Sequence, residues 1–148
     1  MSESTMTEAR ERLQVLLGEW TVAAAPPGGP PWPGAGRVTF GWLGSTPLLI
    51  MRTHVDLPAA PDSISVIGCD AANGTYHQLY TDDRDVQRIY QMSLRDGVWK
   101  LWRGGAPFAQ RFTGTFSDDG MTIDGRWERA DDGQTWETDF DITYTKVA

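Results

Sequence analysis

The chain has 148 residues, of which 40% are hydrophobic, seven are Trp and 16 are Gly, and this length predicts one globular domain. Thirteen basic and 20 acidic residues give a net charge of −7, which argues against non-specific binding to nucleic acid or to an anionic membrane surface. The single cysteine, Cys69, excludes an internal disulfide and a zinc site built from cysteines.

The N-terminal sequence lacks the basic and apolar regions of a signal peptide, and no apolar run is long enough to cross a bilayer. We therefore expect a cytoplasmic protein with no nucleic-acid or membrane partner. We also expect no metal site, because the acidic pairs 82–83, 118–119 and 131–132 are read as turn residues or as neighbours whose side chains point apart. A homodimer is compatible with the sequence, which leaves the oligomeric state open.

One amphipathic helix is predicted near the N-terminus, over residues 7–17. Thr5 and Glu8 have the spacing of a capping box. Apolar residues then recur at helical spacing: Met6, Ala9, Leu13, Leu16 and Leu17. We expect residues 1–6 to form a flexible tail and residues 7–148 to form the domain.

The rest of the chain is typical of a β-sheet protein. Four Asx-Gly pairs, each a strong hairpin signal, separate segments rich in β-forming residues: Asn73-Gly74, Asp96-Gly97, Asp119-Gly120 and Asp132-Gly133. Further turns are expected at Pro58 to Pro61 and at Asp82 to Asp85. The predicted strands are 19–25, 36–43, 47–56, 63–70, 75–82, 86–94, 98–103, 109–117, 121–130 and 134–146.

Residues 26–36 form a loop, because five prolines there cannot donate to a sheet ladder. Trp32 in this loop either covers the mouth of the barrel or pins the loop to the outer wall. Ten strands joined as a meander close most simply into a barrel, which leaves no open edge. The predicted fold class is therefore all-β: a single antiparallel up-and-down β-barrel of about ten strands, with a short N-terminal α-helix closing one end.

Alternation of side chains assigns the inward face of most strands. In the C-terminal half, aromatic, aliphatic and small residues are expected inside: Phe112, Gly114, Phe116, Ile123, Gly125, Trp127, Trp136, Phe140, Ile142 and Tyr144. Acidic residues of the last strand are expected outside: Glu137, Asp139 and Asp141. For the predicted strand 47–56, alternation does not show which face points inward. Arg52 and His54 share one of these two faces, so the sequence leaves open whether they lie inside.

Inward-facing arginines mark the candidate site. Arg88 shares its face with Tyr90, and Arg103 shares its face with Trp99. A buried guanidinium is costly unless an anion or a hydrogen-bond network satisfies it, so these arginines either bind a ligand, pair with internal acids or emerge at the rim. The candidate ligand-binding residues are Arg52, Tyr80, Arg88, Tyr90, Trp99, Arg103, Phe112 and Trp127.

Several motifs carry a resemblance to a known superfamily. They are Leu16-Leu17-Gly18-Glu19-Trp20, Ile67-Gly68-Cys69-Asp70, Arg111-Phe112-Thr113-Gly114-Thr115-Phe116 and Gly125-Arg126-Trp127-Glu128. With a Gly-x-Trp ahead of ten strands, the chain resembles the calycins, which include lipocalins, fatty-acid-binding proteins and nitrobindins, and it looks closest to an uncharacterised bacterial calycin-like family. The resemblance implies that Gly18 and Trp20 form a structural plug and that Lys146, with Arg129 as second choice, covers the Trp ring.

Two functions follow as expectations. The first is binding of a small, largely hydrophobic ligand, possibly one that bears a carboxylate, in the barrel. Fatty-acid-binding proteins hold a ligand carboxylate with an Arg-x-Tyr pair, and Arg88-Ile89-Tyr90 matches that pair in residue type and spacing. In this chain the pair lies in a middle strand and not in the last one. The alternative is an enzyme of the isomerase, cyclase or hydratase type, with His54 or Tyr80 as acid or base.

No cofactor is expected. The resemblance to nitrobindins raises haem as the one cofactor to consider. Nitrobindins bind haem through a histidine late in the chain, and this sequence has no histidine after His77. Prolines between Pro26 and Pro33 also replace the glycine-rich motif that nitrobindins carry after the Trp. Only His54 and His77 could then serve as an axial ligand.

Overall fold

The computed structural model describes residues 2–57, 60–105 and 107–147. Residues 1 and 148 and the first half of the predicted turn at Pro58 to Pro61 lie outside the described residues. Helix α1 (Ser2–Leu13) continues into a 3₁₀ turn, η1 (Gln14–Leu16). Ten strands follow: β1 (Gly18–Ala25), β2 (Gly36–Trp42), β3 (Leu49–Val55), β4 (Ser63–Asp70), β5 (Thr75–Asp82), β6 (Gln87–Arg95), β7 (Val98–Arg103), β8 (Ala109–Phe116), β9 (Thr122–Ala130) and β10 (Glu137–Lys146).

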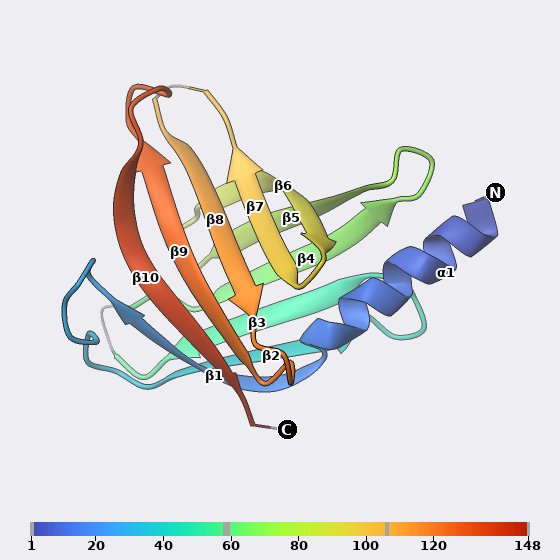
Figure 1. The fold of residues 1–148 in the computed structure, drawn as a ribbon, viewed down its shortest axis with the longest axis horizontal. Helices are drawn as coiled ribbons and strands as arrows, with labels where there is room; N and C mark the ends of the chain where they lie inside the picture. The colour runs from blue at the N-terminus through green and yellow to red at the C-terminus, as the bar shows by residue number, and fades with distance from the viewer. Residues whose placement is uncertain (1, 58–59, 106, 148) are drawn as a thin grey trace.

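The strands form a closed antiparallel barrel in which each strand pairs with its neighbours in the chain and β1 pairs with β10 (Figure 1). Trp20 in β1 lies opposite Val38 of β2 on one side and Lys146 of β10 on the other. Closure satisfies the backbone groups that an open edge would expose. The predicted fold class is confirmed, and the ends of the predicted strands differ from the observed ones by only a few residues.

The predicted hairpin turns are confirmed at all four Asx-Gly pairs, each of which lies between two paired strands. Asp96 and Gly97 have φ angles of 55° and 73°, which are the left-handed values that a two-residue hairpin turn requires. Asp119 and Asp132 accept hydrogen bonds from backbone amides of their own turns. Their carboxylates therefore stabilise turns, as the sequence predicted.

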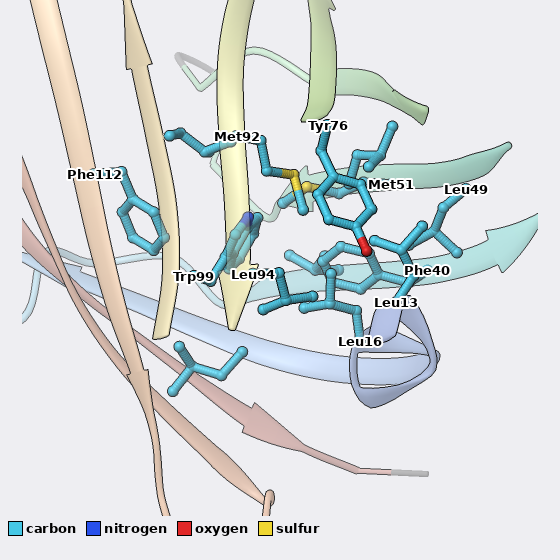
Figure 2. Close-up of a cluster of buried hydrophobic side chains, with 14 of the residues drawn as sticks. Leu13, Leu16, Phe40, Leu49, Met51, Tyr76, Met92, Leu94, Trp99 and Phe112 are labelled. Carbon is cyan, nitrogen blue, oxygen red and sulfur yellow. The ribbon is translucent and has the colours of Figure 1, made fainter. Parts of the chain in front are cut away.

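Helix α1 begins at Ser2, five residues before the start that the sequence predicted for the helix. Residues 2–6 include no Gly or Pro, which are the residues that most oppose a helix. Ala9, Leu13 and Leu16 are buried against the inside of the barrel. The Tyr76 hydroxyl points toward this helix (Figure 2) and donates a 2.7 Å hydrogen bond to the carbonyl of Ala9.

Trp20 closes the barrel at the helix end. Its side chain is fully buried, and its Nε1–H donates a 2.9 Å hydrogen bond to the carbonyl of Leu16. The Lys146 ammonium lies 5.4 Å from the centroid of the Trp20 ring, which is a cation–π geometry. Gly18 has a φ of 119°, which a residue with a Cβ rarely adopts, and so allows the chain to turn from η1 into β1.

The end of the barrel away from α1 is formed by the described parts of five connections, which are residues 26–35, 56–57 with 60–62, 83–86, 104–105 with 107–108, and 131–136. Helix α1 and Trp20 fill the opposite end, so a molecule would reach the lumen from the end with these connections. Within the described part of the chain, no helix has the length and apolar composition needed to cross a membrane.

Candidate functional site

The barrel contains a cavity of about 450 Å³ toward the end away from α1, which is within the usual range for small-molecule sites. The buried side chains of Figure 2 fill the helix end of the lumen, and Met51, Trp99 and Phe112 form the boundary between the two parts. The remaining walls come from residues of the eight strands β3 to β10 and from Pro61, Arg84 and Phe108 in the connections. A lumen that is only partly filled by side chains therefore remains above the plug.

One wall of the cavity is aromatic. The Phe112 ring lies 5.0 Å from the Trp99 ring and 5.2 Å from the Trp127 ring, measured between centroids. It fits because Gly114 and Gly125 lie opposite each other on β8 and β9 beneath it. A Cβ atom at Gly125 would be 2.5 Å from Cε1 of Phe112, so the two glycines provide the space for the ring.

Arg88 is the charged group of the cavity that has no carboxylate partner. Its Nη1 lies 3.4 Å from Oε1 of Gln110, which also accepts a 2.7 Å hydrogen bond from the Tyr90 hydroxyl. The Arg88 guanidinium lies 5.3 Å from the centroid of the Phe108 ring. Within the described chain, no Asp or Glu lies within ion-pair distance of Arg88. An amide and a ring thus orient this cation without neutralising it.

Arg84, the other arginine lining the cavity, is neutralised. Its guanidinium lies 2.6 Å from the fully buried carboxylate of Asp82, which also accepts a 2.7 Å hydrogen bond from Tyr80. Hydrogen bonds from Arg84 hold the pKa of Asp82 well below its usual range. Burial and the bond to Asp82 raise the pKa of Tyr80 to about 12, so the Tyr80 hydroxyl keeps its proton at neutral pH.

Two buried polar atoms of the cavity residues have no hydrogen-bond partner among the described residues. They are Oε1 of Gln78 and Nε1 of Trp99, and both residues line the cavity. The other end of the Gln78 amide donates a 3.2 Å hydrogen bond to the Ser65 hydroxyl. Both atoms are themselves buried, so they are covered by neighbouring protein atoms and not exposed to the open part of the cavity.

A second, smaller pocket of about 360 Å³ lies beneath the loop that precedes β2. The Trp32 ring, whose residue is 48% exposed, forms one side of this pocket and lies 5.8 Å from the ring of Phe140. The residues that line both pockets are Thr53, Pro61, Phe140, Ile142 and Tyr144. Trp32 thus lies beside residues that line the main cavity and does not line that cavity itself.

Six of the eight predicted ligand-binding residues line the cavity together: Tyr80, Arg88, Tyr90, Trp99, Phe112 and Trp127. Arg52 does not, because Met51 and Thr53 are the inward residues of β3 and Arg52 is exposed on the outer face. Arg103 shares the inward parity of β7 but is not part of the cavity wall. Its Nη1 donates a 3.1 Å hydrogen bond to the carbonyl of Phe108 at the rim.

Both histidines lie on the outside of the barrel. His54 is exposed, and its Nδ1 lies 2.7 Å from Oδ1 of Asp62. His77 is exposed on β5, between the inward residues Tyr76 and Gln78. Neither imidazole faces the lumen, so His54 is not placed to act on a molecule there and neither residue could be the axial ligand of a haem in the cavity. In the described ranges, no group of three or more His, Cys, Asp or Glu side chains is arranged to hold a metal ion.

The prediction for the start of the last strand is wrong at two positions. The pairing of β10 with β9 shifts register between Thr138 and Phe140, which indicates a β-bulge, and an extra residue in one strand reverses the alternation of side chains. Asp139 consequently lines the cavity next to Phe140. Trp136 precedes β10 and lies on the outside, where its ring centroid is 4.1 Å from the Arg111 guanidinium.

Sequence reasoning missed the polar residues that complete the site. Ser65, Gln78 and Gln110 are neutral, and their inward parity alone could have identified them. Arg84 and Phe108 lie in connections, where alternation of side chains gives no information. Gln110 is the hydrogen-bond partner of both Arg88 and Tyr90, and Arg84 neutralises Asp82, so the missed residues largely determine the chemistry of the cavity.

Comparison with known proteins identifies a similar fold but no family. No protein-family model and no curated protein matches the chain. Among solved structures, the chain is similar to the crystal structure of Rv2717c from M. tuberculosis, with 15% sequence identity and a TM-score of 0.63. The similarity covers 93% of this chain and 98% of that one, so the two proteins share the barrel over essentially their whole length.

Proposed function

We propose that this protein is a calycin-like barrel that binds a small, largely hydrophobic molecule bearing a carboxylate. The observation that carries the proposal is Arg88, a cation within an aromatic-walled cavity that has only a neutral amide and a ring as partners. Carboxylates form the strongest hydrogen bonds with guanidinium groups. The aromatic wall formed by Trp99, Phe112 and Trp127 would contact the hydrophobic part of the ligand.

Tyr90 supports the same orientation. Burial raises the pKa of its hydroxyl, although Arg88 lowers it in part, so the hydroxyl stays protonated and donates to Oε1 of Gln110, which holds that oxygen beside the guanidinium. Asp139, the acidic residue that lines the cavity, lies 3.9 Å from the Arg129 guanidinium. That pairing reduces the repulsion that a ligand carboxylate would meet at the mouth.

Catalysis in the lumen gains less support from the geometry. The candidate base His54 is outside, and the Tyr80 hydroxyl donates a hydrogen bond to Asp82 and keeps its proton at neutral pH. Binding is therefore the function that the arrangement supports best. A cytoplasmic location, which suits a chain with one free cysteine, stays part of the proposal.

The test compares a fatty acid with its methyl ester by calorimetric titration. A charged hydrogen bond contributes about 1.5–3 kcal/mol, so wild-type protein should bind the acid about 10- to 100-fold more tightly than the ester. Arg88→Met should remove this preference, whereas Arg52→Met, which removes an exposed arginine on the outer face, should leave it unchanged. Equal binding of acid and ester by the wild-type protein would rule out the carboxylate site.

A further inference from the structure

The pocket of about 360 Å³ beneath residues 26–35 is an apolar space. None of its described lining residues is charged, and they include Val22 and Ala24 of β1 and Trp32 of the loop. The Trp32 backbone amide donates a 2.8 Å hydrogen bond to the carbonyl of Ala24, which fixes the loop against β1. Such a pocket favours hydrocarbon, because burial of apolar surface is favourable and a polar group would lose its hydrogen bonds with water.

This second pocket adjoins the main cavity along a shared wall. Of the residues that line both, only Tyr144 is fully buried, and the others are half-buried: Thr53, Pro61, Phe140 and Ile142. Phe140 also joins the aromatic side chains of the two pockets, since its ring centroid lies 5.8 Å from that of Trp32 and 6.4 Å from that of Trp127. A hydrocarbon chain that passes Phe140 would therefore contact both pockets.

Arg88 and the second pocket lie on opposite walls of the barrel. Arg88 is in β6 and the pocket is against β1, and four strands separate β6 from β1 on each side, β2–β5 and β7–β10 (Figure 1). Met51, Trp99 and Phe112 close the lumen below the main cavity. A long hydrocarbon chain that starts at Arg88 therefore has its free space across the mouth and not along the barrel axis.

We propose that the protein selects long-chain aliphatic acids over short-chain ones, with the carboxylate at Arg88 and the end of the hydrocarbon chain beneath Trp32. The inference rests on the proposed function, since that function places the carboxylate at Arg88. A short chain occupies the main cavity alone, whereas a chain that passes Phe140 also buries its end in the second pocket. Each methylene group buried there should increase affinity about fourfold.

The experiment titrates saturated fatty acids of increasing chain length, below their micelle-forming concentrations, into three proteins by calorimetry. In the wild-type protein, affinity should rise about fourfold per methylene until the chain fills the second pocket, and then level off. Ala24→Leu places a larger side chain in that pocket, so it should weaken binding of long acids about tenfold and leave short acids unchanged. Ala23→Leu, on the exposed outer face of the same strand, is the matched control and should behave as the wild-type protein.

The Trp32 indole provides a second measurement, which needs no change to the pocket. In the proton–nitrogen NMR spectrum of the wild-type protein, long acids should shift the Trp32 indole signal, and short acids should leave it in place. Trp32→Phe assigns that signal among the seven Trp residues. This measurement decides the question even if Ala24→Leu does not fold.

The two proposals fail in different ways. Arg88→Met should abolish the preference for acid over ester and retain the difference between Ala24→Leu and Ala23→Leu for long chains. An unchanged chain-length profile for Ala24→Leu, or a Trp32 signal that long acids do not shift, would overturn the site beneath Trp32 and leave the carboxylate site intact. Equal binding of acid and ester, with long chains still weakened by Ala24→Leu, would instead overturn the carboxylate site.

Discussion

Replacing Gly125 by Ala tests the packing of the aromatic wall. The new Cβ would be 2.5 Å from Cε1 and 2.9 Å from Cζ of Phe112, and 3.1 Å from Cγ2 of Ile142. The Phe112 ring has little freedom to move away, because Trp99 and Trp127 flank it at 5.0 and 5.2 Å. The substitution therefore overfills a site that is already closely packed.

The expected loss is about 1–3 kcal/mol of unfolding free energy, the usual range for adding a methyl group to a packed core. For a chain of this size, 1 kcal/mol lowers Tm by about 2–4 °C. Backbone strain adds nothing to this figure, since Gly125 is not among the glycines with a positive φ. Displacement of the ring would also narrow the cavity and weaken ligand binding.

Urea and thermal unfolding measure the effect, and Gly41→Ala is the matched control. Gly41 also lies in a strand without a positive φ, but a Cβ atom there would meet nothing within 4 Å. Its substitution should stabilise the protein by up to about 1 kcal/mol, because alanine restricts the unfolded chain. Unchanged stability of Gly125→Ala would refute the view that Phe112 occupies the space above the glycine.

Two further predictions concern the closed end and the mouth of the barrel. Lys146→Met should lower the unfolding free energy by about 0.5–1 kcal/mol in urea titrations, because it removes a partly exposed cation from the face of Trp20; an equally stable variant would contradict that contribution. The pKa of Asp82 is depressed in the folded state, so the unfolded chain binds its proton first as the pH falls through about 4. The stability that ionised Asp82 contributes is therefore present above that pH and is lost below it. Unfolding curves recorded from about pH 7 to 2 should show that the free energy of unfolding of Asp82→Asn falls less steeply with acid than that of the wild-type protein. Asp124→Asn, at an exposed position of β9, should leave the acid loss as in the wild-type protein, and an unchanged slope for Asp82→Asn would refute the assignment.

The sequence was sufficient to predict the barrel because its signals are local. Paired turn residues such as Asp96-Gly97 determine where hairpins form, and alternation of apolar residues determines which face of each strand is buried. The resemblance based on Gly18 and Trp20 led to the further prediction that one end of the barrel is closed. None of these inferences needed the distance between residues far apart in the chain.

The site was predictable only where alternation continued without interruption. Arg88 and Tyr90 lie on a regular strand, and their inward position followed from parity. The bulge near Asp139 changed parity without any Gly or Pro to mark it, and the face of β3 depended on pairing with strands on both sides. Hydrogen-bond partners such as Gln110 depend on the register across strands, which sequence patterns do not specify.

The polar residues of the lumen lower the stability of the barrel, which argues against a purely structural role. A ten-stranded barrel is wider than one that side chains fill completely, and this chain fills only the end beneath Trp99. Above it, Arg88, Gln78 and Gln110 occupy inward positions where leucine or valine would extend the core and raise stability. Their interactions with one another are incomplete, since among the described residues the Gln78 amide oxygen has no hydrogen-bond partner and the Arg88 guanidinium has no counter-ion. Under the proposed function, a ligand carboxylate would supply the counter-ion that Arg88 lacks, beside the aromatic wall that would contact the rest of the ligand.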